Sequence, residues 1–269
     1  MEGTLMILPN ELKRIAAQQK IALSVVEKDY ALTWVLYGLS KTEFKKYFVF
    51  KGGTAIRKIY FSDWRYSEDL DFTLSKKFSE DELREIINRI NTFLSESVGI
   101  TLNIKSLHSN LEYAQLKIQF IGPLNNKNTI KIDLSFNEPV TLTPKNKEIH
   151  SEYSDKEKHS LLVYPLEEIL AEKIRSILQR AKTRDYYDVW KILKLHNDKI
   201  NVDLLHEVLV KKCQDKKLEF NKDNLFSSER IKPAQEYWEK SLAHQIDNLP
   251  DFQTVVSECK NLINKFLKI

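Results

Sequence analysis

The amino-acid sequence predicts an α+β fold, in which a mixed β-sheet with flanking helices precedes a C-terminal helical bundle. Two observations carry this prediction. Runs with the alternating or apolar pattern of strands all fall between residues 48 and 137, whereas the stretches beyond Pro165 show the three- and four-residue apolar spacing of helices. Together these elements make an α+β layer arrangement.

The composition is that of a folded protein without a membrane segment. Of the 269 residues, 42% are hydrophobic and 30% charged, and 42 basic against 38 acidic residues leave a net charge of +4, which permits a nucleic-acid partner without requiring one. Cys213 and Cys259 show no disulfide framework or zinc spacing, so we expect a reducing cytoplasmic compartment. No signal sequence opens the chain, and no apolar run approaches the roughly 18 residues of a spanning helix.

The first half of the chain should supply the sheet. Residues 1–40 are predicted to be helical as far as Gly38, with Glu27-Lys28-Asp29 as a solvated face. Strands are expected at 48–50, 69–74, 100–106, 112–121 and 129–137, which gives a sheet of about five strands. A capping box at 79–82 should begin a helix that ends near Gly99.

The second half should be helical after a linker. Residues 139–158 are polar and irregular and are interpreted as a loop, so we divide the chain into an α+β domain, 1–145, and a helical domain, 146–269. Lysines 211–212 and 216–217 are interpreted as a solvated face, with contact to RNA as the alternative. Helices are predicted at 166–180, 184–195, 202–213, 233–245 and 252–266.

One stretch combines a phosphate-binding pattern with paired acids. The apolar run 48–50 stops at Lys51-Gly52-Gly53-Thr54 and restarts as a helix, so backbone N–H groups would face an anion there. Asp69 and Asp71 then project from one face of a strand and could hold Mg²⁺, with Mn²⁺ as an alternative ion. An acidic solvated strand face is the simpler interpretation of a D-x-D pair taken alone.

Two further segments could complete such a site. Asp133 lies in a strand patterned like 69–74, and if the two strands are neighbours it becomes a third carboxylate, as metal ligand or general base. Lys173 falls within the apolar stripe of its helix, where it either reaches past the edge of that face to solvent or meets a nucleotide. Arg180, Lys182 and Arg184 suit phosphate contacts, although capping and salt bridges with Asp185 or Asp188 explain much of that pattern.

Taken together, these motifs resemble the AbiEii family of nucleotidyltransferase toxins. The resemblance covers roughly residues 23–195 and depends on four motifs, which are Glu27-Lys28-Asp29-Tyr30, Phe50-Lys51-Gly52-Gly53-Thr54 with Arg57 and Tyr60, Ser67-Glu68-Asp69-Leu70-Asp71-Phe72, and Glu168 and Lys173 with Arg184-Asp185-Tyr186-Tyr187-Asp188. The D-x-D after a glycine-rich turn is general to polymerase-β-like nucleotidyltransferases. The Lys173 helix and the R-D-Y-Y-D run are more specific to this family.

The resemblance implies a nucleotidyltransferase fold and a toxin of a toxin–antitoxin or abortive-infection pair. Gly53 and Thr54 match the element that holds the triphosphate, Asp69 and Asp71 match the metal-binding pair, and Lys173 matches a lysine that contacts nucleotide. Asp188 or Asp185 matches a further acid. We therefore expect catalytic roles for Asp69, Asp71, Asp133, Lys173 and Asp188, and nucleotide contacts from Lys51, Gly52, Gly53, Thr54, Arg57, Lys173, Arg180, Arg184 and Asp185.

The predicted reaction is metal-dependent transfer of nucleotides from an NTP to an RNA acceptor. Related toxins of the MenT group modify the 3′ acceptor end of tRNA, which makes tRNA the first candidate acceptor. Two alternatives stay open at this point: nucleotidylation of a protein side chain, and a non-catalytic module that binds RNA or a partner chain. A cognate antitoxin is an expected partner, and a membrane is not.

Overall fold

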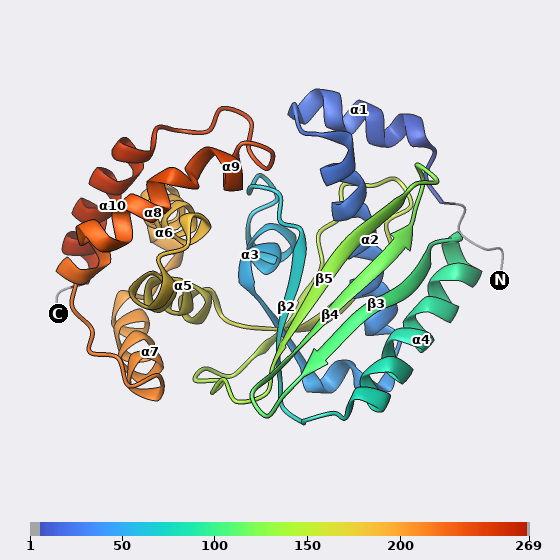
Figure 1. Cartoon of the computed structure of the whole chain (residues 1–269), viewed down its shortest axis with the longest axis horizontal. Coiled ribbons are helices and arrows are strands. Elements are labelled where there is room, and N and C mark those ends of the chain that lie inside the picture. The colour runs from blue at the N-terminus through green and yellow to red at the C-terminus, as the bar shows by residue number, and fades with distance from the viewer. Residues whose placement is uncertain (1–5, 268–269) are drawn as a thin grey trace. The chain divides into compact units, whose positions relative to one another are not determined.

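The computed structural model describes residues 6–267 and divides into two units (Figure 1). The first unit runs to Glu138 and also includes Pro144–Tyr164. The second consists of Pro139–Thr143 and the chain from Pro165 onward. The last passage between the units thus follows Tyr164 and not the predicted 145/146 position, because the strands at 145–148 and 160–163 belong to the sheet.

The first unit is built on a mixed sheet with the strand order β3-β4-β5-β2-β1-β7-β6. β1 pairs in parallel with β7, and β2 in parallel with β5, while the other neighbours are antiparallel. The strands are β1 Phe48–Lys51, β2 Asp69–Leu74, β3 Thr101–Ser109, β4 Tyr113–Ile121, β5 Lys127–Ser135, β6 Lys145–Glu148 and β7 Ser160–Val163.

The sheet therefore has seven strands where about five are predicted. β6 and β7 fall in the stretch interpreted as a loop, or just after it. β6 is a four-residue strand of polar residues at the sheet edge, and β7 is equally short, so neither shows a periodic apolar pattern long enough to recognise.

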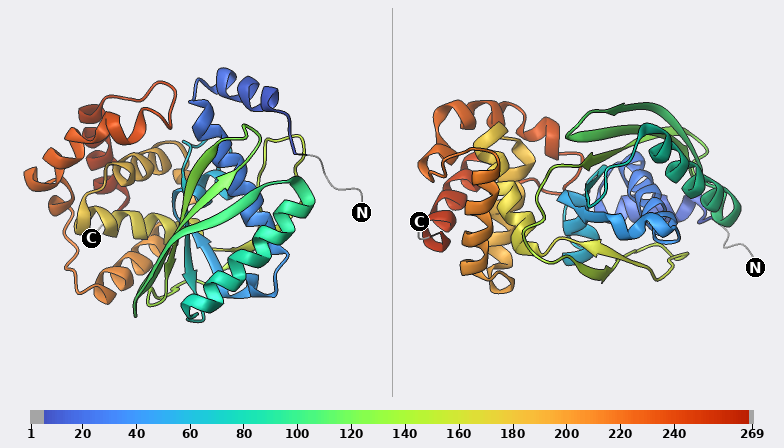
Figure 2. Two further views of the ribbon diagram at one scale, coloured as in Figure 1. Left: turned by 45° about the vertical axis from the view of Figure 1, so that its right-hand side comes forward. Right: turned by 90° about the horizontal axis from the view of Figure 1, so that it is seen from below.

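Helices cover the apolar face of this sheet. α1 spans Pro9–Gln19 and α2 spans Leu23–Ser40, so the predicted single helix is interrupted at Lys20, whose φ of 51° ends α1 in the left-handed conformation. α4 spans Glu80–Val98 behind the predicted capping box, in which Ser79 accepts from the Glu82 N–H and the Glu82 side chain accepts from the Ser79 N–H. Figure 2 shows α2 and α4 on the same side of the strands.

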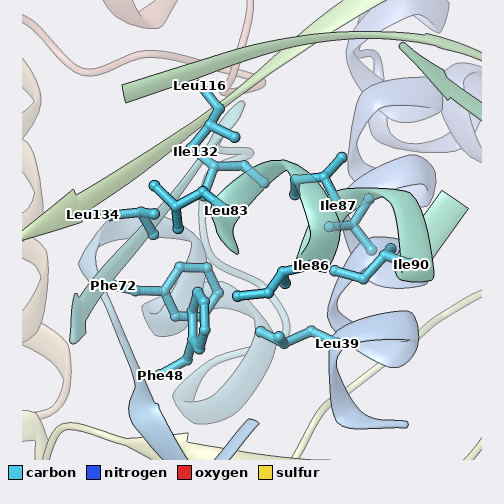
Figure 3. A pocket seen from close by; sticks show the side chains of 11 residues that line it. Leu39, Phe48, Phe72, Leu83, Ile86, Ile87, Ile90, Leu116, Ile132 and Leu134 are labelled. Atoms are coloured by element: carbon cyan, nitrogen blue, oxygen red, sulfur yellow. The ribbon is translucent and has the colours of Figure 1, made fainter. Parts of the chain in front are cut away.

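A small cavity of about 20 Å³ lies in this apolar layer (Figure 3). Only aliphatic and phenylalanine side chains line it, among them Leu39 of α2, Phe72 of β2 and Ile86 of α4. A cavity of this kind offers no partner to a charged phosphate and is a packing gap of the core. Nucleotide chemistry must therefore be sought on the opposite, polar face of the sheet.

The prediction of a solvated face at Glu27-Lys28-Asp29 is wrong for both acids. Glu27 is buried and accepts a hydrogen bond from the N–H of Leu124, and burial raises its pKa. Asp29 is fully buried, with Oδ2 at 2.5 Å from Nζ of Lys58 and 2.8 Å from the hydroxyl of Tyr153. Polar residues at helical spacing usually face water, and here their partners come from distant segments that the helix pattern does not reveal.

The second unit is a helical bundle, as predicted. Its helices are α5 Leu166–Arg180, α6 Thr183–Leu195, α7 Val202–Asp215, α8 Ser228–Glu236, α9 Trp238–Leu242 and α10 Phe252–Phe266. The helix expected at 233–245 is in fact α8 followed by α9, and α8 begins before Pro233 and includes it. Every helix or strand element from Leu166 to Phe266 is helical.

The segment Pro139–Thr143 belongs to this bundle because buried charges hold its backbone. The Glu168 carboxylate accepts hydrogen bonds from the N–H groups of Thr141 and Leu142, at 2.7 and 2.9 Å. Lys212 donates to the carbonyl of Pro139 at 2.6 Å and lies 2.8 Å from Oε1 of Glu168. Lys212 is fully buried, so the prediction that it belongs to a solvated lysine face is wrong.

Within the described residues, no helix is both long and apolar enough to cross a lipid bilayer.

Candidate active site

The glycine turn lies where the sequence predicts it. β1 ends at Lys51, α3 spans Gly52–Ala55, and a π-helical turn from Ile56 to Tyr60 continues it. Gly52 has a φ of 80°, a backbone conformation that side chains disfavour. This strand–glycine–helix arrangement directs backbone N–H groups of the turn toward a prospective anion.

Asp71 of β2 lies directly against this turn. A methyl group placed on Gly52 would be 2.2 Å from Oδ2 of Asp71 and 2.9 Å from its Cβ. Glycine is thus needed at position 52 for its positive φ and for the close approach of the carboxylate. The loop predicted to bind phosphate and the acid predicted to bind metal are therefore in contact.

Replacing Gly52 by alanine should reduce the predicted nucleotide transfer about a hundredfold, because the new methyl group displaces the Asp71 carboxylate by about an ångström or more. Gly99 is the matched control, since its φ is 75° and an added methyl group would meet only Met6, at 3.6 Å. Both variants should lose about 1 kcal/mol of unfolding free energy from the unfavourable φ. Transfer rates and thermal melts of the two proteins test this, and equal activities would contradict it.

Polar side chains form one row across the four neighbouring strands β1, β2, β5 and β4. The row lies on the open face, which is the polar face of the sheet opposite α2 and α4. Lys51 is opposite Asp71, Asp71 is opposite Asp133, and Asp133 is opposite Gln115. Residues in register share a face of the sheet, so the three charged groups and the amide lie side by side. The hypothesis that the strands of Asp71 and Asp133 are neighbours is thereby confirmed.

Gln115 is a site residue that the sequence analysis missed. Its Nε2 donates to Oδ1 of Asp133 at 2.7 Å, which fixes the orientation of that carboxylate. The signal was present, since Gln115 occupies a polar position of a strand with the same alternation as the strand of Asp133. Only the strand order identifies it as the neighbour of the acid.

The acids of this row suit a magnesium ion that shares its coordination with substrate. Asp69 and Asp71 are half-buried carboxylates on one face of β2, and Mg²⁺ is commonly held by one or two carboxylates together with phosphate oxygens and water. Among residues 6–267, no three His, Cys, Asp or Glu side chains are grouped to hold a metal by themselves. Asp69 and Asp71, with Asp133 oriented by Gln115 beside them, are the residues that could hold the ion together with substrate oxygens.

Thr54 and Arg57 are placed differently from the prediction. Thr54 is fully buried, and its hydroxyl donates to the backbone carbonyl of Asp69, so it ties the helix to β2 and does not face the open side. The guanidinium of Arg57 is buried over the ring of Tyr66 and donates to Glu152 at 2.8 Å. The structure does not support a nucleotide contact by either side chain.

Arg65 and Ser67 are polar neighbours of the turn that received no role in the sequence analysis. A methyl group on Gly53 would lie 2.8 Å from Nη2 of Arg65 and 3.1 Å from Oγ of Ser67. A guanidinium this close to a glycine turn adds positive charge where an anion is expected. The only signal in the sequence is the position of Arg65, four residues before the first residue of β2.

The second unit contains a separate polar cluster around Lys173. Its ammonium lies 2.6 Å from Oδ2 of Asp188 and 3.1 Å from Oδ1 of Asp185, and the lysine is 8% exposed. Ser176, which the sequence analysis did not select, donates to Oδ2 of Asp185 at 2.7 Å and accepts from Nε of the exposed Arg180 at 2.8 Å. The lysine in the apolar stripe is thus held by both candidate acids, and Arg184 lies half-buried next to them in sequence.

Comparison with known proteins identifies a protein family and solved structures of similar fold. A family model described as nucleotidyl transferase AbiEii toxin, type IV toxin–antitoxin system, matches residues 34–258. No curated protein matches the sequence. The structure is similar to that of MenT4, a nucleotidyltransferase toxin from Mycobacterium tuberculosis H37Rv, with a TM-score of 0.74 and 17% identity over 98% of this chain and 90% of that one.

A second similar structure is described as a nucleotidyltransferase from H. pylori. It has a TM-score of 0.58 and 17% identity, over 92% of this chain and 96% of that chain. At this level of identity both likenesses concern the fold.

Proposed function

The chain belongs to the AbiEii family of nucleotidyltransferase toxins of toxin–antitoxin systems, and from this membership we propose that it transfers nucleotides from an NTP to an RNA acceptor. The 3′ end of tRNA is the first candidate acceptor. We propose Mg²⁺ as the ion, with Mn²⁺ as an alternative, and a cognate antitoxin as the partner that controls the activity.

The observation that carries the proposal is the contact between the glycine turn and the acid row. Asp71 lies against Gly52 and directly opposite Asp133, so a triphosphate on the turn would have its reacting phosphorus beside the carboxylates. Bound between Asp69, Asp71 and the phosphates, Mg²⁺ would neutralise charge on the reacting phosphate and the leaving group. The task of the protein is then mainly positioning and charge neutralisation.

Each residue of the row has a separate task in this proposal. The turn at Gly52 and Gly53 holds the phosphates through its N–H groups, with Lys51 and Arg65 nearby as cations. Oδ1 of Asp133 accepts from Gln115, which leaves Oδ2 to accept the proton of the attacking hydroxyl. The new bond joins the acceptor oxygen to the α-phosphate, the bond to the β-phosphate breaks, and pyrophosphate leaves.

In the second unit we propose Lys173 as a nucleotide contact that Asp185 and Asp188 orient. Support comes from the family likeness and from the burial of this ion triad. A buried lysine held by two carboxylates has few rotamers available, which suits a group that must meet a phosphate.

The test is an incorporation assay with each of the four labelled NTPs in turn, in the presence of Mg²⁺ or Mn²⁺, total RNA and total protein. We expect label in the RNA fraction, within it in tRNA, and loss of label when Asp69 and Asp71 are both replaced by asparagine. Label confined to the protein fraction would reject the RNA acceptor in favour of protein nucleotidylation. Toxicity that survives the double replacement would indicate a binding module.

A further inference from the structure

On the open face of the sheet, two lysines continue the acid row away from the glycine turn. In register, Asp69 of β2 is opposite Lys131 of β5, and Lys131 is opposite Lys117 of β4. Both lysines are exposed, whereas their strand neighbours Ile130, Ile132, Leu116 and Ile118 are buried on the other face. The lysines thus stand on the same face as the acids, one and two strands away, a step of about 4.8 Å per strand.

This pair of lysines is not explained by the stability of the fold. Like charges directly opposite each other in an antiparallel pair are destabilising. Within residues 6–267, no carboxylate lies in ion-pair range of either ammonium group. Two exposed cations at facing positions, beside a reaction centre, are the arrangement expected of a binding site for a polyanion.

The position of Lys131 and Lys117 relative to the glycine turn indicates which polyanion they would bind. The glycine turn follows β1, on one side of β2, and Lys131 and Lys117 are on β5 and β4, on the other side. In an in-line displacement, the attacking hydroxyl approaches the α-phosphate opposite to the leaving pyrophosphate. If the turn holds the triphosphate, the acceptor must approach over β5 and β4.

We infer that Lys131 and Lys117 bind the phosphodiester backbone of the RNA acceptor, close to its reactive hydroxyl. The surface is defined by these two lysines and by uncharged neighbours on the same face, Gln119 and Thr129. Backbone contacts of this kind position a nucleic acid without reading its sequence. This inference rests on the proposed function, because it takes the acceptor to be RNA.

The test measures binding without catalysis. The double variant Lys117→Gln/Lys131→Gln and the wild type are titrated into fluorescently labelled, unfractionated tRNA without NTP, over a range of salt concentrations. The double variant Lys13→Gln/Lys260→Gln is the matched control, since it removes the same charge from two exposed helix positions. We expect the site variant alone to raise the dissociation constant about tenfold. It should also reduce the slope of the logarithm of the binding constant against the logarithm of salt concentration by about 1.4 in magnitude, from two lost contacts.

Further readouts separate a binding role from a structural one. The KM for NTP should not change. The melting temperature of the site variant should stay within a few degrees of that of the wild type, because the repulsion between the lysines and the attraction of Lys131 to Asp69 are removed together. Equal weakening by the site and control variants, or no weakening by either, would overturn the inference. A wild type that transfers nucleotide to RNA while the site variant binds tRNA normally would overturn it and leave the proposed function intact.

Discussion

Asp71→Asn is expected to abolish nucleotide transfer, with a loss of at least about a hundredfold, and to remove toxicity while the protein remains folded. Asparagine keeps the size of the side chain next to Gly52 but removes the negative charge in the row between Lys51 and Asp133. A neutral amide holds Mg²⁺ far more weakly than a carboxylate does. Incorporation of labelled NTP and growth after induced expression measure the two effects.

The control for this variant is Glu96→Gln, an equal change of charge at an exposed position of α4. It should retain full activity, and both variants should melt within a few degrees of the wild type. An Asp71→Asn protein that still arrests growth at the same expression level would rule out the assigned role of Asp71.

Asp29→Asn is expected to lower the free energy of unfolding of the first unit by about 3–5 kcal/mol. Asp29 lies 2.5 Å from Nζ of Lys58 and 3.4 Å from Nε of Arg57, and all three side chains are buried. Removing the carboxylate charge leaves Lys58 in the interior without its counterion and leaves Arg57 with Glu152 alone. Urea unfolding followed by fluorescence measures the loss, and Glu96→Gln should change stability by less than 0.5 kcal/mol in either direction, the usual range for such surface changes.

The pH dependence of this difference follows from the pKa of Asp29. Burial by itself raises that pKa, but the charges of Lys58 and Arg57 outweigh burial and hold it below its ordinary value of 3.8. An acid whose pKa is lowered on folding stabilises the fold above its unfolded pKa, and this contribution is lost as the pH falls through the folded pKa. The difference in free energy of unfolding between wild type and Asp29→Asn should therefore be constant from about pH 5 to about pH 8 and should narrow below about pH 4.

The double variant Asp29→Leu/Lys58→Met distinguishes a need for charge balance from a need for these particular side chains. It replaces the buried pair with apolar groups of similar size and should recover much of the stability that Asp29→Asn loses. A double variant as unstable as the single one would show that the ion pair itself is required.

The sequence identified the parts of the fold whose patterns are local. The alternation in 69–74 and 129–137, the capping box at Ser79 and the periodicity of α5 each depend on near neighbours in the chain, and these predictions hold. β6 and β7 have no such local pattern, because pairing with β1 and with each other is what makes them strands. Tertiary pairing that overrides a polar local sequence cannot be recognised from that sequence.

At the candidate site, too, residues placed by a local pattern were predicted, and residues placed by distant segments were missed. The side on which Asp71 and Asp133 project follows from strand alternation, and the inward direction of Lys173 follows from its place in an apolar stripe. The burial of Thr54, Arg57 and Asp29 depends on which distant segments pack against their helices, and no spacing rule contains that information. Residues in a recognisable motif can thus have partners within the fold that the motif does not predict.

The short segment Pro139–Thr143 has a consequence for how this protein can be divided. The chain passes between units after Glu138, after Thr143 and after Tyr164, so no single cut separates them. A fragment that ends at Tyr164 carries Pro139–Thr143 without its anchor. A fragment that begins at Pro165 keeps the pair of Lys212 and Glu168 but removes the two N–H groups that donate to Glu168 and the carbonyl that accepts from Lys212. The helical bundle is therefore complete only with Pro139–Thr143, a segment that a cut at Tyr164 separates from it.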